Sequence, residues 1–270
     1  MLVQRIKTLV NEPEVNLELL SAEVGSQNHL EIARLLHHLS KEGKILVFNC
    51  LDCDLKRCQV LYETDRDSRV EIHESLVRQG CFEPSSFRDC FNMDGSELNP
   101  VPKGILNKIK GLFVNSRYSM SVFMRMSQFF FLKYIHSTGK AGRLYRFGAY
   151  ATQKLNIIAN QFEHGMNPNV EAGVIFKHTN VCLTGRAVIE SGAYIYRSVT
   201  LGYRGGKAPH IKKNAKIASH SIILGGVTVG EKAIVGAGAV VLIDVPAGKI
   251  AAGVPAKIIG DVTEDIYNSF

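Results

Sequence analysis

The chain has 270 residues, 46% of them hydrophobic, and a formal net charge of +7. This length suffices for two domains with a substantial core, and no apolar run reaches the roughly 18 residues needed to span a bilayer. The first residues contain Glu and Pro where a secretion signal needs an apolar stretch, which argues against export. We therefore expect a cytoplasmic protein, and six cysteines without a framework spacing agree with a reducing compartment.

The charge is divided unevenly along the chain. Residues 1–108 contain 13 Lys/Arg and 17 Asp/Glu, whereas residues 109–270 contain 19 and 8. Between Ile109 and Phe162 there are eight basic residues and no acidic one. Because nucleic-acid binding requires a basic face, the acidic N-terminal part predicts no nucleic-acid partner.

The N-terminal segment, residues 1–103, has the element order of a winged-helix module. Residues 17–25 and 29–43 predict helices that end at glycines. Residues 44–49 and 57–63 predict two strands around a polar turn. We expect a small winged-helix-like α/β module whose role is contact with another protein.

Three cysteines, Cys50, Cys53 and Cys58, lie on this predicted hairpin. A zinc site would need a fourth ligand, which Cys81 or Cys90 could supply. However, the chain has no second CxxC and no HxxxH to complete such a site. The sequence therefore favours reduced cysteines and predicts no metal site.

A linker and a basic helical segment follow. Residues 83–104 contain three prolines and predict the linker. The segment 104–162 predicts two helices, over residues 118–137 and 142–160. We expect these helices to pack against the next domain, to contact the inner face of a membrane peripherally, or to do both.

From Ile211 to Val245 the sequence repeats with a strict period of six. An aliphatic residue recurs at every sixth position, and a small or β-branched residue follows each one four positions later: Ile211, Ile217, Ile223, Val229, Val235 and Val241, with Ala215, Ser221, Val227, Ala233, Ala239 and Val245. A helix (period 3.6) or an ordinary strand (period 2) does not produce this spacing. A coil with three six-residue faces per turn does, with the aliphatic residues inside.

The period continues toward the N-terminus. Two further runs keep the period of six, and the earlier one is displaced from the later one by a single residue: Leu183, Ile189, Ile195 and Leu201, and before them Val170, Phe176 and Cys182. Ten residues separate Leu201 from Ile211, which predicts a loop from Gly202 to His210. We therefore predict a coil over residues 163–260 and a short tail over residues 261–270.

Two stretches of the coil resemble a known family. FKHTNVCLTGRAVIESGAYIYRSVTLG (residues 176–202) and AAGVPAKIIG (residues 251–260) resemble the hexapeptide-repeat acyltransferases. The first stretch is similar to serine O-acetyltransferases and to the acetyltransferases of surface-polysaccharide pathways. The resemblance implies a left-handed parallel β-helix, hence an α+β chain, with acetyl-CoA as co-substrate.

The resemblance also assigns roles to single residues. Acetyl transfer to a hydroxyl needs a base, an oxyanion donor and a groove for the thioester arm. His178 matches the catalytic base, and Glu163, fifteen residues upstream, matches its orienting acid, although a two-residue gap would place Gly165 there instead. The oxyanion donor and the coenzyme-binding positions implied are the N–H of Tyr203, with Gly202, Ser219, Ala237 and Lys257.

This sequence differs from the serine O-acetyltransferases at positions that would bind the acceptor. Lys177 replaces the acid before their catalytic histidine, and Ala208 replaces their second histidine. Lys177 repels the ammonium of serine, and together with Arg204, Lys207 and His210 it gives the cleft a positive entrance. We therefore expect a glycan hydroxyl of a surface polysaccharide as acceptor, with a serine O-acetyltransferase and a non-catalytic β-helix scaffold as alternatives.

The predicted site also implies an assembly. Within one coil, no other part of the chain is expected to lie opposite His178 and the loop from Gly202 to His210 and so close a cleft. We therefore expect a homotrimer whose active sites lie between subunits.

Overall fold

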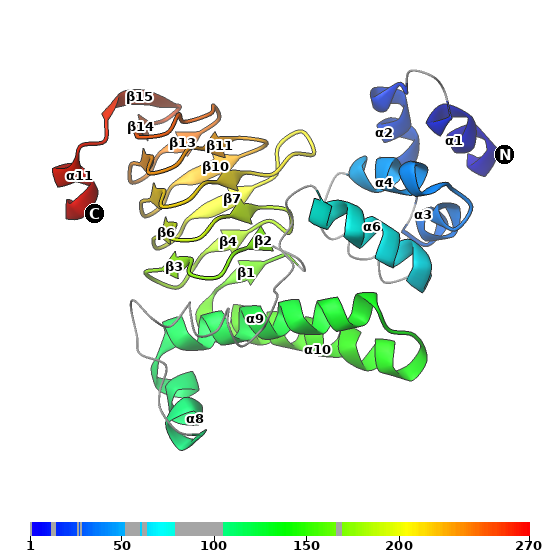
Figure 1. Cartoon of the computed structure of the whole chain (residues 1–270), viewed down its shortest axis with the longest axis horizontal. Coiled ribbons are helices and arrows are strands. Elements are labelled where there is room, and N and C mark those ends of the chain that lie inside the picture. Colours follow the sequence, from blue (N-terminus) through cyan, green and yellow to red (C-terminus); the bar gives the residue numbers. More distant parts are fainter. Residues whose placement is uncertain are drawn as a thin grey trace. The chain divides into compact units, whose positions relative to one another are not determined.

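The computed structural model describes residues 2–11, 15–25, 27, 29–51, 60, 64–78, 105–165 and 169–270. Contacts between residues divide the chain into two compact units (Figure 1). The first comprises Met1–Cys81 and Phe131–Arg146, and the second comprises Phe82–Phe130 and Phe147–Phe270. The division predicted from the sequence, at residues 103, 162 and 260, stays a prediction.

The described elements of the N-terminal part are helices. They are α1 (Leu2–Val10), α2 (Leu17–Gly25), α3 (His29–Leu36), α4 (Lys41–Asn49) and α6 (Arg66–Arg78). Their core contains the fully buried Ile6, Leu20 and Leu36. An ion pair of 2.7 Å between Lys44 and Glu71 joins α4 to α6.

The winged-helix prediction is wrong at its first strand. Residues 44–49 belong to helix α4, which begins after Ser40, whose hydroxyl accepts a hydrogen bond from the N–H of Gly43 (3.2 Å). Gly43 and Val47, four residues apart in α4, are both buried. This spacing is that of one helix face, so the cap and the tertiary burial override the β propensity of the run.

The other N-terminal predictions have mixed outcomes. Helix α2 matches the helix predicted over residues 17–25, whereas the one predicted over 29–43 ends at Leu36. The linker at 83–104 and most of the strand predicted at 57–63 lie outside the described residues. Cys50 is half-buried and forms no disulfide with another described cysteine. The remaining predicted ligands lie outside the described residues: Cys53, Cys58, Cys81 and Cys90.

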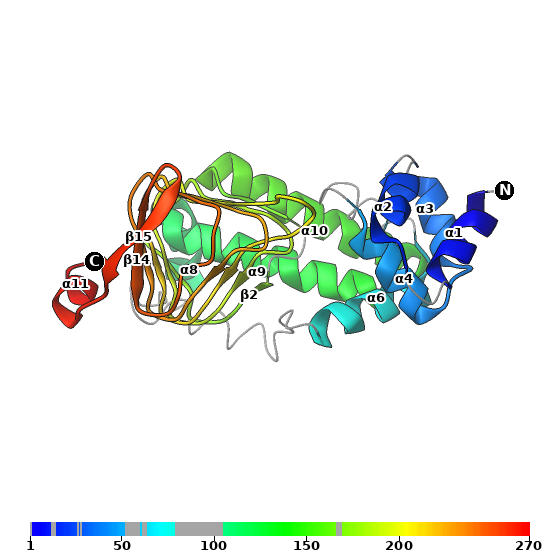
Figure 2. The ribbon, with the colours of Figure 1, turned by 90° about the horizontal axis from the view of Figure 1, so that it is seen from above.

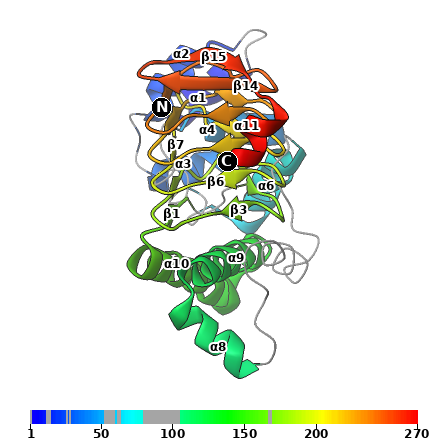
Figure 3. The same ribbon diagram turned by 90° about the vertical axis from the view of Figure 1, so that its left-hand side faces the viewer.

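Three helices precede the coil: α8 (Ile105–Val114), α9 (Ser116–Ile135) and α10 (Gly139–Asn160). The last two match the helices predicted from the sequence. The buried guanidinium of Arg125 on α9 donates to the carbonyl oxygens of Val170 (2.6 Å) and Glu171 (2.9 Å) in the first turn of the coil. The predicted packing of this segment against the coil is therefore confirmed, and Figure 3 shows α9 and α10 beneath β1 and β3. In the part of the chain that the structure describes, no helix is long and apolar enough to cross a membrane.

The C-terminal part is a parallel coil of about five turns with three flat sheets. Figure 2 looks along the coil and shows its turns stacked on one another. Sheet A contains β1 (Glu163–His164), β4 (Cys182–Leu183), β7 (Thr200–Gly202), β10 (Ile222–Leu224) and β13 (Val240–Val241). Sheet B contains β2 (Asn169–Val170), β5 (Val188–Ile189), β8 (His210–Ile211) and β11 (Thr228–Val229).

Sheet C closes the prism. It contains β3 (Ile175–Phe176), β6 (Tyr194–Ile195), β9 (Lys216–Ile217), β12 (Ile234–Val235), β14 (Lys249–Gly253) and β15 (Ala256–Asp261). Neighbouring strands pair in parallel within each sheet, except that β14 and β15 form an antiparallel hairpin at the far end. A short helix, α11 (Glu264–Ser269), ends the chain.

The period-six residues fill the coil as predicted. Those from Ile189 to Val241 are completely buried, and they stack in register from one turn to the next. The α+β architecture of helices followed by a parallel β-helix is therefore confirmed. Cys182 is the exception, because seven residues separate the inward Phe176 from the inward Leu183, and Cys182 is left on the outer face, half-buried.

His164, in the first turn, is a buried neutral histidine. Its Nδ1 lies 2.9 Å from the carbonyl oxygen of Gly165, and its Nε2 has no hydrogen-bond partner among the described residues. Burial lowers the pKa of His164 from 6.5 to about 4. A proton on this ring would therefore cost stability.

We predict that the protein loses stability as the pH falls from 7 to 5. Because the pKa of His164 is lower in the folded state than in the unfolded state, the unfolded chain binds more protons in this window. This histidine should remove about 2 kcal/mol from the free energy of unfolding, measured by denaturant titration at the two pH values. A His164→Phe variant should lose most of this dependence, and an unchanged slope would contradict the assignment.

Candidate functional site

One edge of the coil, where sheet C turns into sheet A, is built from stacked residues with positive φ. We call it the CA corner, and its levels carry φ angles between 56° and 68° at Asn180, Ser198, His220 and Gly238. Backbone hydrogen bonds join successive levels, from the N–H of His220 to Arg197 (2.9 Å) and from Gly238 to Ser219 (3.0 Å). The corner is therefore a continuous edge with exposed backbone.

His178 lies at the first level of the CA corner, between β3 and β4, and is exposed. Ser219 and Ala237 lie two and three levels further along, or about 10 and 14 Å at the usual spacing of strands. Lys257 lies beyond them, on β15 opposite Ala252. Three predicted coenzyme-binding positions thus follow one edge that begins at the predicted base.

Glu163, the predicted partner of His178, lies on the outer face of sheet A. It is in register with Cys182, whose Sγ is 4.0 Å from its carboxylate. Within the described residues, no hydrogen bond or ion pair joins Glu163 to His178. The alternative position, Gly165, has no side chain to offer. The pairing of His178 with an acid therefore stays a prediction.

The loop predicted after Leu201 is a tight hairpin at the corner between sheets A and B, which we call the AB corner. Arg204 and Lys207 exchange two backbone hydrogen bonds, of 3.2 and 3.3 Å. Gly205 and Gly206 between them have φ angles of 60° and 70°, as the two-residue turns of hairpins require. The hairpin therefore holds two exposed cations in fixed positions.

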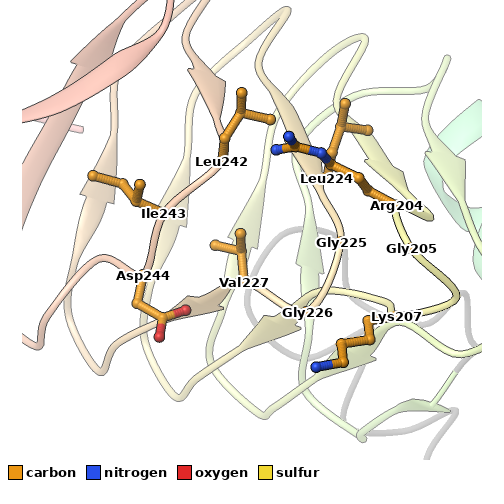
Figure 4. Close-up of a pocket in the computed structure, with 10 residues that line it drawn as sticks. All are labelled: Arg204, Gly205, Lys207, Leu224, Gly225, Gly226, Val227, Leu242, Ile243 and Asp244. Carbon is orange, nitrogen blue, oxygen red and sulfur yellow. The ribbon is translucent and has the colours of Figure 1, made fainter. Parts of the chain in front are cut away.

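A pocket of about 630 Å³ opens beneath this hairpin (Figure 4). Its walls include the predicted acceptor-binding Arg204 and Lys207, the backbone of Gly225 and the carboxylate of Asp244. The Oδ1 of Asp244 accepts a hydrogen bond from the N–H of Thr228 (2.7 Å). No sequence motif marks Asp244, because only the stacking of turns brings it beside the hairpin.

His210 is held by a carboxylate on the outer face of sheet B. Its Nε2 lies 2.8 Å from Oε1 of Glu190, to which Lys212 also donates (2.9 Å). Although burial opposes it, the hydrogen bonds from Lys212 and His210 hold the pKa of Glu190 below its ordinary value. The register of β5 with β8, which sequence spacing does not reveal, brings these groups together.

Lys177 lies on sheet C beside an aromatic ring shared with a second lysine. Its Nζ is 5.1 Å from the ring centroid of Tyr194, and the Nζ of Lys216 is 5.0 Å from the same ring. Burial and the charge of Lys177 lower the pKa of Lys216. Tyr267 of the C-terminal tail covers Lys216, with the ammonium 3.7 Å from its ring centroid. The tail therefore packs on sheet C, near Lys177.

The predicted base and the predicted oxyanion donor thus lie on two different corners, whereas Glu163, His210, Lys177 and Lys257 lie on the flat faces. His178, Ser219 and Ala237 belong to the CA corner, and sheet A separates them from the AB corner with its Gly202, Tyr203, Arg204 and Lys207. A single chain does not bring the base and the basic hairpin into one cleft.

We predict that Gly225→Ala destabilises the coil and displaces the hairpin. Gly225 has a φ of 83°, and an added Cβ would meet the Cβ of Arg204 at 3.1 Å. The free energy of unfolding should fall by about 1–2 kcal/mol, and proteolysis after Arg204 should become faster. Gly260→Ala is the matched control, because its added Cβ meets nothing within 4 Å. Equal stability of the two variants would refute the close contact.

The coil is similar to a known protein family and to enzymes of known activity. Residues 208–242 match the family described as bacterial transferase hexapeptide (six repeats). The serine acetyltransferase of Escherichia coli (strain K12) is 37% identical over 117 residues, which cover 41% of this chain and 43% of that protein. That of Buchnera aphidicola subsp. Schizaphis graminum is 34% identical over 134 residues, 47% and 50% of the two chains. The chain spans about half the length of the curated relatives it matches.

Solved structures agree on the fold. Serine acetyltransferase from Brucella abortus strain S19 gives a TM-score of 0.52 at 22% identity, over 94% of this chain and 87% of that one. A serine acetyltransferase in complex with CoA gives 0.53 at 20% identity, over 88% of this chain and 100% of that one. The resemblance of the coil to the left-handed β-helix of hexapeptide-repeat acyltransferases, in particular the serine acetyltransferases, is therefore confirmed.

Proposed function

We propose that the protein is an acetyl-CoA-dependent O-acetyltransferase. The observation that carries this proposal is the exposed His178 at the first corner of a hexapeptide β-helix similar to that of serine acetyltransferases. Imidazole is suited to removing a hydroxyl proton near neutral pH. An exposed corner gives such a base access to both substrates, whereas a purely structural scaffold has no need of it.

Acetyl-CoA fits along the CA corner. Small residues at Ser219 and Ala237 leave the backbone open to a pantetheine arm, and a Cβ added to Gly238 would meet nothing within 4 Å. Two exposed cations, Lys257 and Arg197, can bind phosphates from this edge. Arg197 was not expected from the sequence, because no motif marks it as a binding residue. It follows Tyr196, two positions after the inward Ile195.

We further propose a homotrimer with its sites between subunits. In a closed ring around an axis parallel to the coil, the CA corner of one chain can face the AB corner of its neighbour. His178 of one subunit would then lie opposite the hairpin and pocket of the next. The division of the site residues between two corners supports this arrangement.

The reaction then follows from these groups. The imidazole of His178 accepts the proton of the acceptor hydroxyl as its oxygen attacks the thioester carbonyl. The N–H of Tyr203 stabilises the oxyanion that forms. Collapse of this intermediate expels the CoA thiolate, which takes the proton from the imidazolium. A carboxylate at Glu163 would stabilise that imidazolium.

Serine is the acceptor that the comparisons favour, in preference to the polysaccharide expected from the sequence. The two curated relatives described above, which are among several, are serine acetyltransferases. The pocket at the AB corner also suits an amino acid, because Arg204 and Lys207 can bind a carboxylate and Asp244 an ammonium.

A sugar hydroxyl is the second candidate. It is favoured by Lys177, which lies beside the predicted base and shares the Tyr194 ring with a second cation, Lys216. Ala208 also removes a polar group that a serine site would use. A surface rich in cations suits an anionic glycan, which it attracts over long range.

We predict that His178→Ala lowers acetyl-CoA turnover by about 10²–10⁴, the usual contribution of a general base. Thermal unfolding should be unchanged, because the side chain is exposed. Glu163→Gln should cost less, and His38→Ala, an exposed histidine far from the coil in sequence, should cost nothing. A normal rate for His178→Ala would remove this histidine from the mechanism and make His210 the next candidate.

The acceptor is tested by measuring CoA release with serine and with a panel of neutral and anionic glycans. We expect serine to give the higher kcat/KM. Faster reaction with an anionic glycan would establish the second candidate instead. Binding of acetyl-CoA without transfer to any acceptor would support the scaffold alternative.

A further inference from the structure

Helix α10 has polar residues on its inner face and apolar residues on its outer face. Thr152, Asn156 and Asn160 are buried, and Asn156 donates to the carbonyl oxygen of Met120 on α9 (3.1 Å). In contrast, Phe147 and Ile158 are 68% and 79% exposed. This is the reverse of the pattern of a helix on the surface of a water-soluble domain.

The exposed apolar residues form one stripe. Leu144, Phe147, Leu155 and Ile158 recur at intervals that keep them on one side of a helix of 3.6 residues per turn. Helix α8, in the same compact unit as Phe147 and Ile158, adds two apolar side chains, Leu106 and Phe113, that are 83% and 88% exposed. So much exposed apolar surface on two helices points to an apolar partner.

The charged residues of helices α8 and α10 are all basic. Lys140, Arg143 and Lys154 on α10 and Lys110 on α8 are exposed, and the chain has no acidic residue between 109 and 162. A second copy placed against this face would bring cations against cations, which disfavours self-association. An anionic lipid surface offers both an apolar layer and the opposite charge.

We propose that the outer face of α10 binds the surface of an anionic membrane, with Phe147, Leu155 and Ile158 in the interface and Lys154 at the headgroups. The coil, which packs on the other side of the helix pair through Arg125, would then stand on the membrane. This role does not depend on the proposed acetyl transfer.

The test is flotation of the full chain with vesicles of phosphatidylcholine, with and without phosphatidylglycerol. We expect binding only to the anionic vesicles, weakening as salt rises from about 0.05 to 0.5 M. Lys154→Gln should weaken binding about fivefold, and the double variant Phe147→Ser/Ile158→Ser at least about tenfold. Thermal unfolding of each variant shows whether a loss of binding reflects a loss of folding.

Two matched controls lie on the coil. Lys213→Gln removes an exposed cation and Ile259→Ser an apolar residue that is 65% exposed, and neither should change binding. The proposal would be overturned if the full chain did not float with anionic vesicles at low salt. It would also be overturned if the α10 variants bound these vesicles as well as the unmodified chain does. A smaller oligomer for Phe147→Ser/Ile158→Ser in sedimentation would also overturn it, because a second copy would then cover this face.

Discussion

The burial of one aliphatic side chain in each six-residue face is the interaction on which the rest of the coil depends. It fixes how far the chain advances before it must turn, so each corner lies directly above the one before. Residues such as Asn180, Ser198 and His220 then adopt positive φ at matching positions. The cost of this backbone conformation is offset by the packing on either side of the corner.

The same stacking determines where chemistry can occur. The flat faces consist of short strands that pair with strands of the neighbouring turns, whereas the stacked residues with positive φ lie at the corners. One corner carries His178 and a series of small residues, and another carries the Arg204–Lys207 hairpin over Gly225. Because a rigid prism holds these corners apart, a site that uses both needs a second subunit.

Sequence reasoning succeeded where the physical signal is periodic and local. The hexad predicted the aliphatic residues that fill the coil from Ile189 to Val241, and the longer interval after Leu201 predicted the loop that the structure shows as a hairpin. It failed at residues 44–49, where a β-branched and aromatic run folds as a helix because Ser40 caps it and Val47 packs inward. It also missed Glu190, which contacts His210 in the next turn, and Asp244, which lies two turns beyond the Arg204–Lys207 hairpin and lines the same pocket. Both contacts depend on the register between turns.

The central claim, that a base on one subunit works with a hairpin on its neighbour, is tested by mixing two inactive variants. His178→Ala chains and Arg204→Ala/Lys207→Ala chains would be co-expressed, and the acetyl-CoA turnover of the mixed oligomers measured. If the site is shared, random assembly leaves about a quarter of the interfaces with both parts intact, and activity returns to about that fraction of the unmodified protein. If mixed oligomers form and remain inactive, the site lies within one chain and the account is wrong.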